Sequence, residues 1–204
     1  MAGNQGHRND WISTFPFYWM SEVEAFSGAA YALSTSIDTM LASVAATSGV
    51  YTESGLSFMQ PVNPTNLATL KQRGAKVMVY HGVSDPIFSA NDTANWYEGL
   101  RTNNSGDASN FARYYPVPGM SHCGMGPATD QFDMLTSLVN WVEKGQAPDS
   151  VVAGVRAAGN VAGANPDLPA SWSANRTRPL CAYPKVARYN GTGDIESASS
   201  FSCK

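Results

Sequence analysis

Two residues of types that can carry out acid–base chemistry each follow a short apolar segment of the sequence. Asp85 stands directly before Pro86, in a polar loop that begins soon after the run Val77–Tyr80. His122 stands in a loop bounded by glycine and proline, after residues 111–117. A carboxylate that accepts a hydrogen bond from an imidazole fixes its tautomer and orientation, which is how a histidine is prepared to act as a general base. The alternatives are an Asp85 that caps the next helix and an ordinary loop histidine.

The elements that must position these residues are predicted to be two parallel strands. Residues 76–80 and 111–117 are short, apolar and rich in β-branched and aromatic residues, which is typical of strands buried on both faces. The sequence between them is long enough for one crossover helix. Because the carboxyl ends of parallel strands meet at one edge of a sheet, where α/β proteins bind ligands, Asp85 and His122 are expected to lie close together there. An Asp followed by a His is also the order in which an α/β-hydrolase completes a Ser…Asp…His triad.

The segments around both residues resemble the tannase and feruloyl esterase family. The resemblance rests on HGVSDPIFSANDTANWYEGL at residues 81–100 and PVPGMSHCGMGP at 116–127. It is dense from about residue 52 to 204 and looser before. It implies an α/β-hydrolase with a large lid, in which Asp85 is the acid of the HGxxDxxxS loop and His122 the base of the GxxHC loop. It also implies that Cys123 forms a disulfide with a cysteine directly before the nucleophilic serine.

The nucleophile itself has no counterpart in this sequence. The family places its serine in a C-S-x-G-G elbow, and neither that string nor G-x-S-x-G occurs among the 204 residues. The fold class is therefore predicted as α/β, the carboxyl-terminal portion of an α/β-hydrolase sheet with the end of a lid region. Residues 1–50, which include an aromatic cluster at 11–19, would be the end of the lid and its return to the core, or simply a packed aromatic layer. Residues 51–204 would be the part of the core that carries the acid and base loops.

Three functions remain open from the sequence. The first is a carboxylic ester hydrolase for small aromatic esters of feruloyl, galloyl or terephthaloyl type, with the serine and a cysteine partner for Cys123 supplied by an amino-terminal part or a second chain. His81 and Phe88 flank the acid loop and would line the acyl pocket, although Phe88 equally suits a buried anchor. The second is a non-catalytic fragment or assembly module of that fold. The weakest uses Ser121 or Cys123, beside His122, as the nucleophile.

The chain has three cysteines. The family has a disulfide within a similar R-P-L-C…S-F-S-C frame, which implies a Cys181–Cys203 bridge worth roughly 3 kcal/mol in the chain-entropy model. The alternative is three free thiols.

Composition excludes several classes of function. A formal charge of −3 and a pI near 5.5 argue against nucleic-acid binding. No stretch approaches eighteen consecutive apolar residues, so no membrane span is expected. No C-x-x-C or H-x-x-x-H spacing occurs, and neither a metal nor another cofactor is predicted. The start, MAGNQGHRND, lacks the layout of a signal peptide, but the resemblance implies a secreted or periplasmic protein.

Periodicity predicts four helices besides the two strands. They cover residues 25–41, 66–73 with a stop at Gly74, 89 or 91 to 102, and 131–144. In the last helix an apolar stripe is expected to pack against the sheet; it consists of Leu135, Leu138, Val139 and Val142. Few regular elements are predicted beyond Pro148.

Overall fold

The computed structural model describes residues 29–59 and 61–204. The chain divides into two compact units, Met1–Pro64 and Thr65–Lys204. The first contains the helices α2 (Ala29–Ser34), α3 (Ile37–Val44) and α4 (Gly55–Met59). The aromatic cluster at residues 11–19 lies outside the described residues, and the assignment of residues 1–50 to a lid stays a prediction.

The single helix predicted over residues 25–41 is wrong in its described part, because α2 and α3 are separate. Ser36 adopts an extended backbone, and its hydroxyl accepts a hydrogen bond from the Thr39 N–H. A serine that caps a helix in this way satisfies one of its unpaired N–H groups and sets its start. The Ser and Thr residues of this segment therefore favour a break over a continuous helix.

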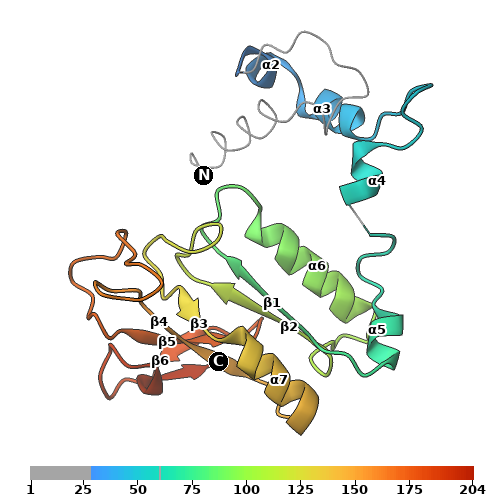
Figure 1. The fold of residues 1–204 in the computed structure, drawn as a ribbon. Coiled ribbons are helices and arrows are strands. Elements are labelled where there is room, and N and C mark those ends of the chain that lie inside the picture. Colours follow the sequence, from blue (N-terminus) through green and yellow to red (C-terminus); the bar gives the residue numbers. More distant parts are fainter. Residues whose placement is uncertain (1–28, 60) are drawn as a thin grey trace. The chain divides into compact units, whose positions relative to one another are not determined.

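The second unit contains the predicted pair of parallel strands. β1 (Val77–Gly82) pairs with β2 (Ala112–Val117) from Val77↔Ala112 to Gly82↔Val117. The crossover between them is α6 (Ala90–Thr102), and β1 is preceded by the short helix α5 (Ala68–Gln72). Gly74, with a φ of +73°, follows the end of α5 as predicted. The strand pair and its crossover are confirmed (Figure 1).

Each face of the strand pair belongs to a different apolar core, because successive side chains of a strand point to opposite faces. On one face, Tyr97 and Leu100 of α6 pack with Ala112 and Tyr114 of β2. On the other, a second cluster joins β2 to α7 and to a second sheet; its buried members are Tyr115, Val117, Met120, Ala128, Val151, Ala153 and Leu180, and Met134 packs against it.

Helix α7 (Met134–Lys144) begins three residues later than predicted. Asp133 caps it by accepting a hydrogen bond from the Thr136 N–H, and Gly145, with a φ of +68°, ends it. The preceding residues Gln131–Phe132 form the short strand β3 instead. The start is later because the carboxylate of Asp133 supplies a cap that the sequence places inside the predicted helix.

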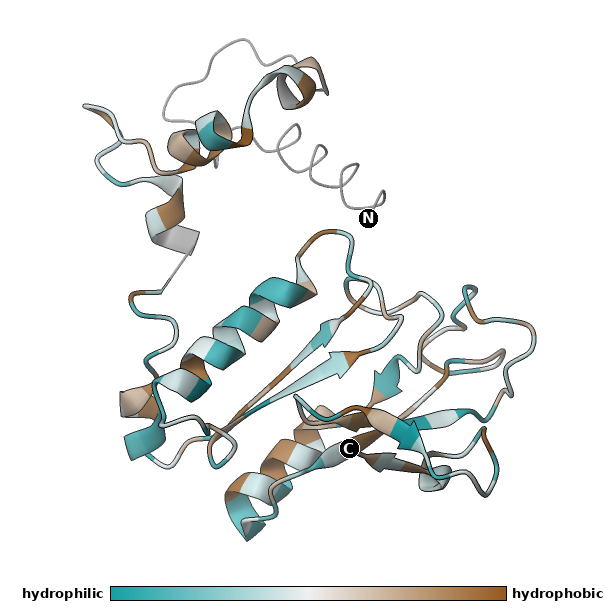
Figure 2. Ribbon diagram, turned by 180° about the vertical axis from the view of Figure 1, so that it is seen from behind, coloured by the Kyte–Doolittle hydropathy of each residue, from teal (hydrophilic) through white to brown (hydrophobic). Residues whose placement is uncertain are grey.

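The prediction that the apolar stripe of α7 packs against the sheet is wrong for most of its members. Leu135, Val139 and Val142 are 71%, 39% and 57% exposed. The buried residue of the helix is Trp141, whose ring lies under the cations of Lys76 and Arg113. Figure 2 shows the hydrophobic residues distributed along α7. The helix therefore packs on the rest of the chain through Trp141, and most of the apolar stripe is exposed.

The residues beyond Pro148 form more regular structure than predicted. β4 (Ser150–Gly154) lies between β3 and β5 (Thr177–Cys181) in an antiparallel three-stranded sheet. β6 (Ala187–Tyr189) pairs with β7 (Phe201–Cys203), which follows the short 3-10 helix η2 (Ala198–Ser200). The expectation of few elements here is therefore wrong.

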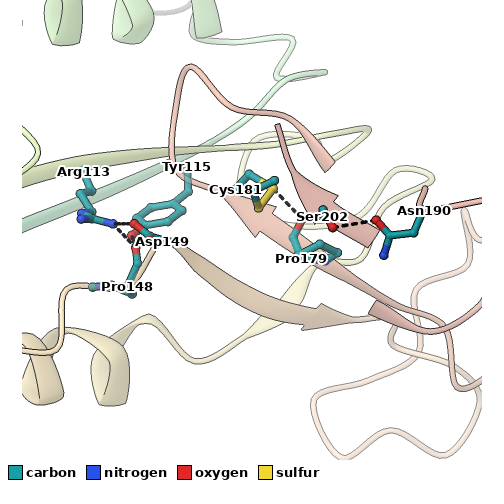
Figure 3. Close-up of a disulfide and its surroundings, with 9 residues drawn as sticks. Arg113, Tyr115, Pro148, Asp149, Pro179, Cys181, Asn190 and Ser202 are labelled. Carbon is teal, nitrogen blue, oxygen red and sulfur yellow. Dashed lines mark hydrogen bonds and ion pairs between the residues drawn. A yellow bond between two sulfur atoms is a disulfide. The ribbon is translucent and has the colours of Figure 1, made fainter. Parts of the chain in front are cut away.

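A disulfide and a set of hydrogen bonds hold the residues beyond Pro148 in place. The Cys181–Cys203 disulfide joins the end of β5 to β7, as predicted. Arg113 and Tyr115 of β2 both donate hydrogen bonds to the carbonyl of Pro148, and Arg113 also pairs with Asp149 at 2.6 Å (Figure 3). Within the described ranges 29–59 and 61–204, no helix is long and apolar enough to cross a membrane.

Candidate active site

The loop after β1 turns the carboxylate of Asp85 inward. Its side chain is only 2% exposed, and its Oδ1 accepts hydrogen bonds from the backbone N–H groups of Ile87 at 2.8 Å and Phe88 at 3.1 Å. Pro86 follows Asp85 and has no N–H of its own, so the next two amides are the ones available to the carboxylate. This local turn fixes one oxygen of Asp85 and leaves the other to face the loop after β2.

That second oxygen accepts from two imidazoles. Oδ2 of Asp85 lies 2.8 Å from Nδ1 of His122 and 3.1 Å from Nε2 of His81. The predicted approach of Asp85 and His122 at the carboxyl edge of the parallel strands is therefore confirmed as geometry. The second contact was not predicted, because the sequence suggested only that His81 lines a substrate pocket.

The charge of Asp85 follows from these contacts. Burial raises the pKa of Asp85. The hydrogen bonds from His122 and from the Ile87 and Phe88 N–H groups together lower the pKa by more, so it lies below its ordinary value. Near neutral pH the group is a carboxylate that only accepts hydrogen bonds. Each imidazole nitrogen that faces it must therefore carry a proton.

This requirement separates the two histidines. In neutral His122 the proton lies on Nδ1, and Nε2 has a free lone pair with no hydrogen-bond partner among the described residues. The side chain is 38% exposed, so this lone pair is accessible. In His81 both nitrogens are engaged, since Nδ1 lies 2.7 Å from the Thr93 hydroxyl. Of the two rings, only His122 is equipped to take a proton from a nucleophile.

The acid and base loops are joined through their backbones. The N–H groups of Val83 and Ser84 donate to the carbonyls of Val117 and Met120, each at 3.0 Å. A side chain at Gly82 would collide with the carbonyls of Met120 and Ser121, so only glycine lets the two loops approach so closely. These contacts hold His122 beside the end of β1.

A buried ion pair supports the far end of the base loop. Oδ2 of Asp130 accepts from the Met125 N–H at 2.8 Å and from Nη2 and Nε of Arg156 at 2.6 and 3.0 Å. Gly126 is tied in the same way, because its N–H donates to Asp167 and its carbonyl accepts from Asn165. The Asp130 side chain is fully buried, and its Oδ1 has no hydrogen-bond partner.

The contacts of the pair favour the charged form of both members. Burial raises the pKa of Asp130, but the hydrogen bonds from Arg156 and the Met125 N–H lower it by more, so the value falls below the ordinary one. The hydrogen bond to Asp130 in turn raises the pKa of Arg156. The pair thus holds the loop that presents His122.

Phe88 contacts His122 and also lines a hollow beside β1 and the start of α6. Its ring centroid lies 5.2 Å from that of His122, and the residue is 47% exposed. It is therefore not a buried anchor. The hollow has a volume of about 530 Å³, and its walls come from β1 and the start of α6; they are Val79, His81, Phe88, Ser89, Asp92, Thr93 and Trp96. Both residues predicted to bind substrate line this hollow, but their role stays a prediction.

Sequence reasoning missed Thr93, Asp130 and Arg156, which support the acid and the base loop. Thr93 lies 12 positions from His81, and Arg156 lies 26 positions from Asp130, so no local spacing signals these pairs. Cys123 is exposed and forms no disulfide, and the use of Ser121 or Cys123 as a nucleophile stays a prediction. Among the described residues no group of three or more metal-ligating side chains is assembled.

Comparison with known families places this geometry in context. A model of the family described as tannase and feruloyl esterase matches residues 32–204. The chain belongs to this family. It is 46% identical over 166 residues to the mono(2-hydroxyethyl) terephthalate hydrolase of Piscinibacter sakaiensis, covering 78% of this chain and 24% of that one. It is 34% identical over 145 residues to a probable feruloyl esterase of Arthroderma benhamiae, covering 69% and 25%.

Solved structures of esterases match as well. The feruloyl esterase B of Aspergillus oryzae superposes with a TM-score of 0.54 at 28% identity, over 69% of this chain and 29% of that one. Another esterase from the same organism gives a TM-score of 0.65 at 20% identity, over 89% and 38%, which supports the mixed α/β fold. The chain spans about a quarter of the length of the curated relatives it matches.

Proposed function

We propose that this chain supplies the acid and the base of a carboxylic ester hydrolase. The observation that carries the proposal is the buried Asp85 carboxylate, which holds the proton of His122 on Nδ1 and leaves Nε2 free. The nucleophile would be a serine outside this sequence, held in an amino-terminal part or a second chain that also offers a cysteine to Cys123. Residues 51–204 would then be the acid- and base-bearing part of an α/β-hydrolase core.

The reaction would follow the course of other Ser-His-Asp hydrolases. His122 Nε2 takes the proton of the serine hydroxyl as the oxygen attacks the ester carbonyl, and then returns that proton to the departing alcohol. Water attacks the acyl-enzyme in the second half, again with His122 as the base, and the acid is released. Asp85 stays ionised throughout and stabilises the imidazolium formed in each half. The oxyanion hole would come from outside this sequence, as the serine does.

The substrate proposed is a small aromatic ester of feruloyl, galloyl or terephthaloyl type. The half-exposed ring of Phe88 beside His122 offers an aromatic wall to an acyl group of that kind. The named relatives include a feruloyl esterase and a terephthalate ester hydrolase. The Cys181–Cys203 disulfide favours an oxidising compartment, which suits a secreted or periplasmic protein.

A second candidate is an assembly module without turnover of its own. It is favoured by the lack of a nucleophile elbow in the sequence and by the exposed apolar stripe of α7. In this reading the acid–base pair is retained as scaffold, and the chain binds another polypeptide through the uncovered surface.

A chimera separates the two candidates. Residues 52–204 of this chain replace the corresponding segment of the Piscinibacter sakaiensis relative, and hydrolysis of mono(2-hydroxyethyl) terephthalate is measured. If the proposal is right, the chimera hydrolyses the ester, while His122→Ala lowers kcat by about 10⁶-fold and Asp85→Asn by about 10⁴-fold. The isolated chain should turn over aromatic methyl esters little or not at all.

Two results would contradict the proposal. One is a folded chimera whose rate is the same with and without His122→Ala. The other is robust hydrolysis by the isolated chain that survives His122→Ala. A chimera that folds, as judged by circular dichroism and its melting temperature, but has no activity would favour the assembly module.

A further inference from the structure

His81 has a different place in the site from the one expected of a substrate-binding residue. Its Nε2 lies 3.1 Å from Asp85 Oδ2, its Nδ1 lies 2.7 Å from Thr93 Oγ1, and its side chain is 13% exposed. Both ring nitrogens are thus engaged by the protein. The residue can offer only ring surface to a molecule in the hollow, and it has no lone pair to act as a second base.

The two partners of His81 define its tautomer. The Asp85 carboxylate accepts but does not donate, so Nε2 must carry the proton that it shares with Oδ2. In the neutral ring Nδ1 is then the acceptor, and the Thr93 hydroxyl donates to it. Thr93 lies in the first turns of α6, which is held against the strand pair by its own buried residues Tyr97 and Leu100. The packing of α6 therefore fixes the Thr93 hydroxyl beside Nδ1 of His81.

We infer that His81 is a positioning residue for the acid–base pair: its Nε2–H, in the tautomer set by Thr93, holds Oδ2 of Asp85 in front of Nδ1 of His122. With two backbone donors on Oδ1 and two imidazoles on Oδ2, the carboxylate cannot rotate without breaking several hydrogen bonds. This inference deepens the proposed function and rests on it for any effect on turnover. Its structural part concerns this chain alone and is tested on it.

The first test is nitrogen NMR of the imidazoles in the 204-residue chain at pH 7.5. The chemical shifts of the two ring nitrogens distinguish an Nε2–H tautomer, an Nδ1–H tautomer and a doubly protonated ring. His81 is expected to be the neutral Nε2–H form, and His122 the neutral Nδ1–H form. Thr93→Val keeps the shape of the threonine but removes its hydroxyl, so the preference of His81 for one tautomer should weaken.

The second test follows the carboxyl carbon of Asp85 through a pH titration. His81→Phe removes the donor and keeps a ring, and it should shift the titration of Asp85 upward. His81→Gln keeps an N–H donor near the position of Nε2, and it should restore the wild-type titration. Asp92 also lines the hollow, so Asp92→Asn is measured to separate its field from the hydrogen bond.

The third test uses the chimera described above. His81→Phe should lower kcat by about tenfold, the size of loss expected when an outer hydrogen-bond partner of a site is removed, with little change in KM. His81→Gln should recover most of the rate. A change confined to KM would identify His81 as a substrate contact and would contradict a positioning role.

The outcomes separate this inference from the proposed function. An Nδ1–H or doubly protonated His81 in the wild-type chain would overturn the inference even if His81→Phe fails to fold. So would an Asp85 titration that is unchanged in His81→Phe. If the tautomer and the titration behave as expected but the chimera is inactive, the structural inference stands and the proposed ester hydrolysis fails.

Discussion

The helices α6 and α7 contact opposite faces of the β1–β2 pair and place their apolar residues differently. α6 buries Tyr97 and Leu100, which are 3% and 0% exposed. α7 exposes Leu135 and Val142 to 71% and 57% and buries only Trp141. The chain therefore covers the apolar face of α6, whereas no described residue of the second unit covers the outer side of α7.

The strands β1 and β2 also differ in how fully the described residues cover them. β2 is buried along most of its length, because β1 lies on one side and the backbone of Tyr183 donates to the Tyr114 carbonyl on the other. β1 has β2 as its partner strand in the described sheet, and its Tyr80 is 51% exposed. An open strand edge beside an exposed apolar helix is a surface that usually binds more polypeptide. The comparison thus distinguishes a side that the described residues cover from one that they leave exposed.

The largest effect is expected where the chain buries a charge completely. Arg156→Met removes the partner of Asp130, whose side chain is fully buried, and should lower the free energy of unfolding by about 3–5 kcal/mol. Arg101→Met is the matched control, because the Arg101 and Glu98 side chains are 31% and 44% exposed and such a pair is worth about 1 kcal/mol or less. Urea unfolding followed by tryptophan fluorescence measures both. Equal losses in the two variants would mean that burial does not decide the strength of these pairs.

A matched pair of leucines tests the two helices directly. Leu100→Ala in α6 should lower the free energy of unfolding by about 2–5 kcal/mol, since it empties a fully buried site. Leu135→Ala in α7 should change it by less than about 0.5 kcal/mol, because that side chain is mostly exposed. Urea midpoints and binding of a hydrophobic dye measure the two effects. A large loss of stability from Leu135→Ala would show that the chain covers the stripe of α7 after all, and the comparison would then fail.

Local pattern and one topological rule were enough to predict that Asp85 and His122 lie together. The apolar runs at residues 76–80 and 111–117 gave the strands, and the rule that parallel strands end at one edge brought Asp85 and His122 together. The limit is visible at His81. Nothing in the string HGVSD tells a substrate-binding histidine from one that donates to the aspartate four residues later. That distinction depends on Thr93 and on how α6 packs, which only the tertiary structure provides.

The elements that the sequence did not predict are those held by distant partners. β5 contains Pro179 and is only five residues long, so its own composition argues weakly for a strand. It forms because β4 pairs along its whole length and Cys203 fixes its end. The prediction that the apolar stripe of α7 packs against the sheet was wrong for a related reason. Helical periodicity reveals which residues share a face, but it does not reveal what covers that face.

The smallest effect concerns an ion pair in the loops before β5 and η2. Glu196 accepts hydrogen bonds from Arg176 and from the Ser173 N–H, and the guanidinium of Arg176 lies 4.0 Å from the centre of the Trp172 ring. The hydrogen bond from Arg176 is the main cause that lowers the pKa of Glu196 from 4.5 to about 2. A pKa lowered by folding stabilises the native state above the unfolded pKa, and this contribution is lost as the pH falls through the folded one.

Glu196→Gln should therefore be less stable than the wild type at pH 5–7, and the difference should shrink as the pH falls from about 4.5 toward about 2. Urea midpoints measured at intervals of pH follow this convergence. Glu143→Gln, at the exposed end of α7, removes one negative charge without an ion pair and should change the free energy of unfolding by less than about 0.5 kcal/mol. If the gap between wild type and Glu196→Gln stays constant down to pH 2, the stabilisation comes from the shape of the side chain, and the Arg176 pair contributes no charge-dependent stability.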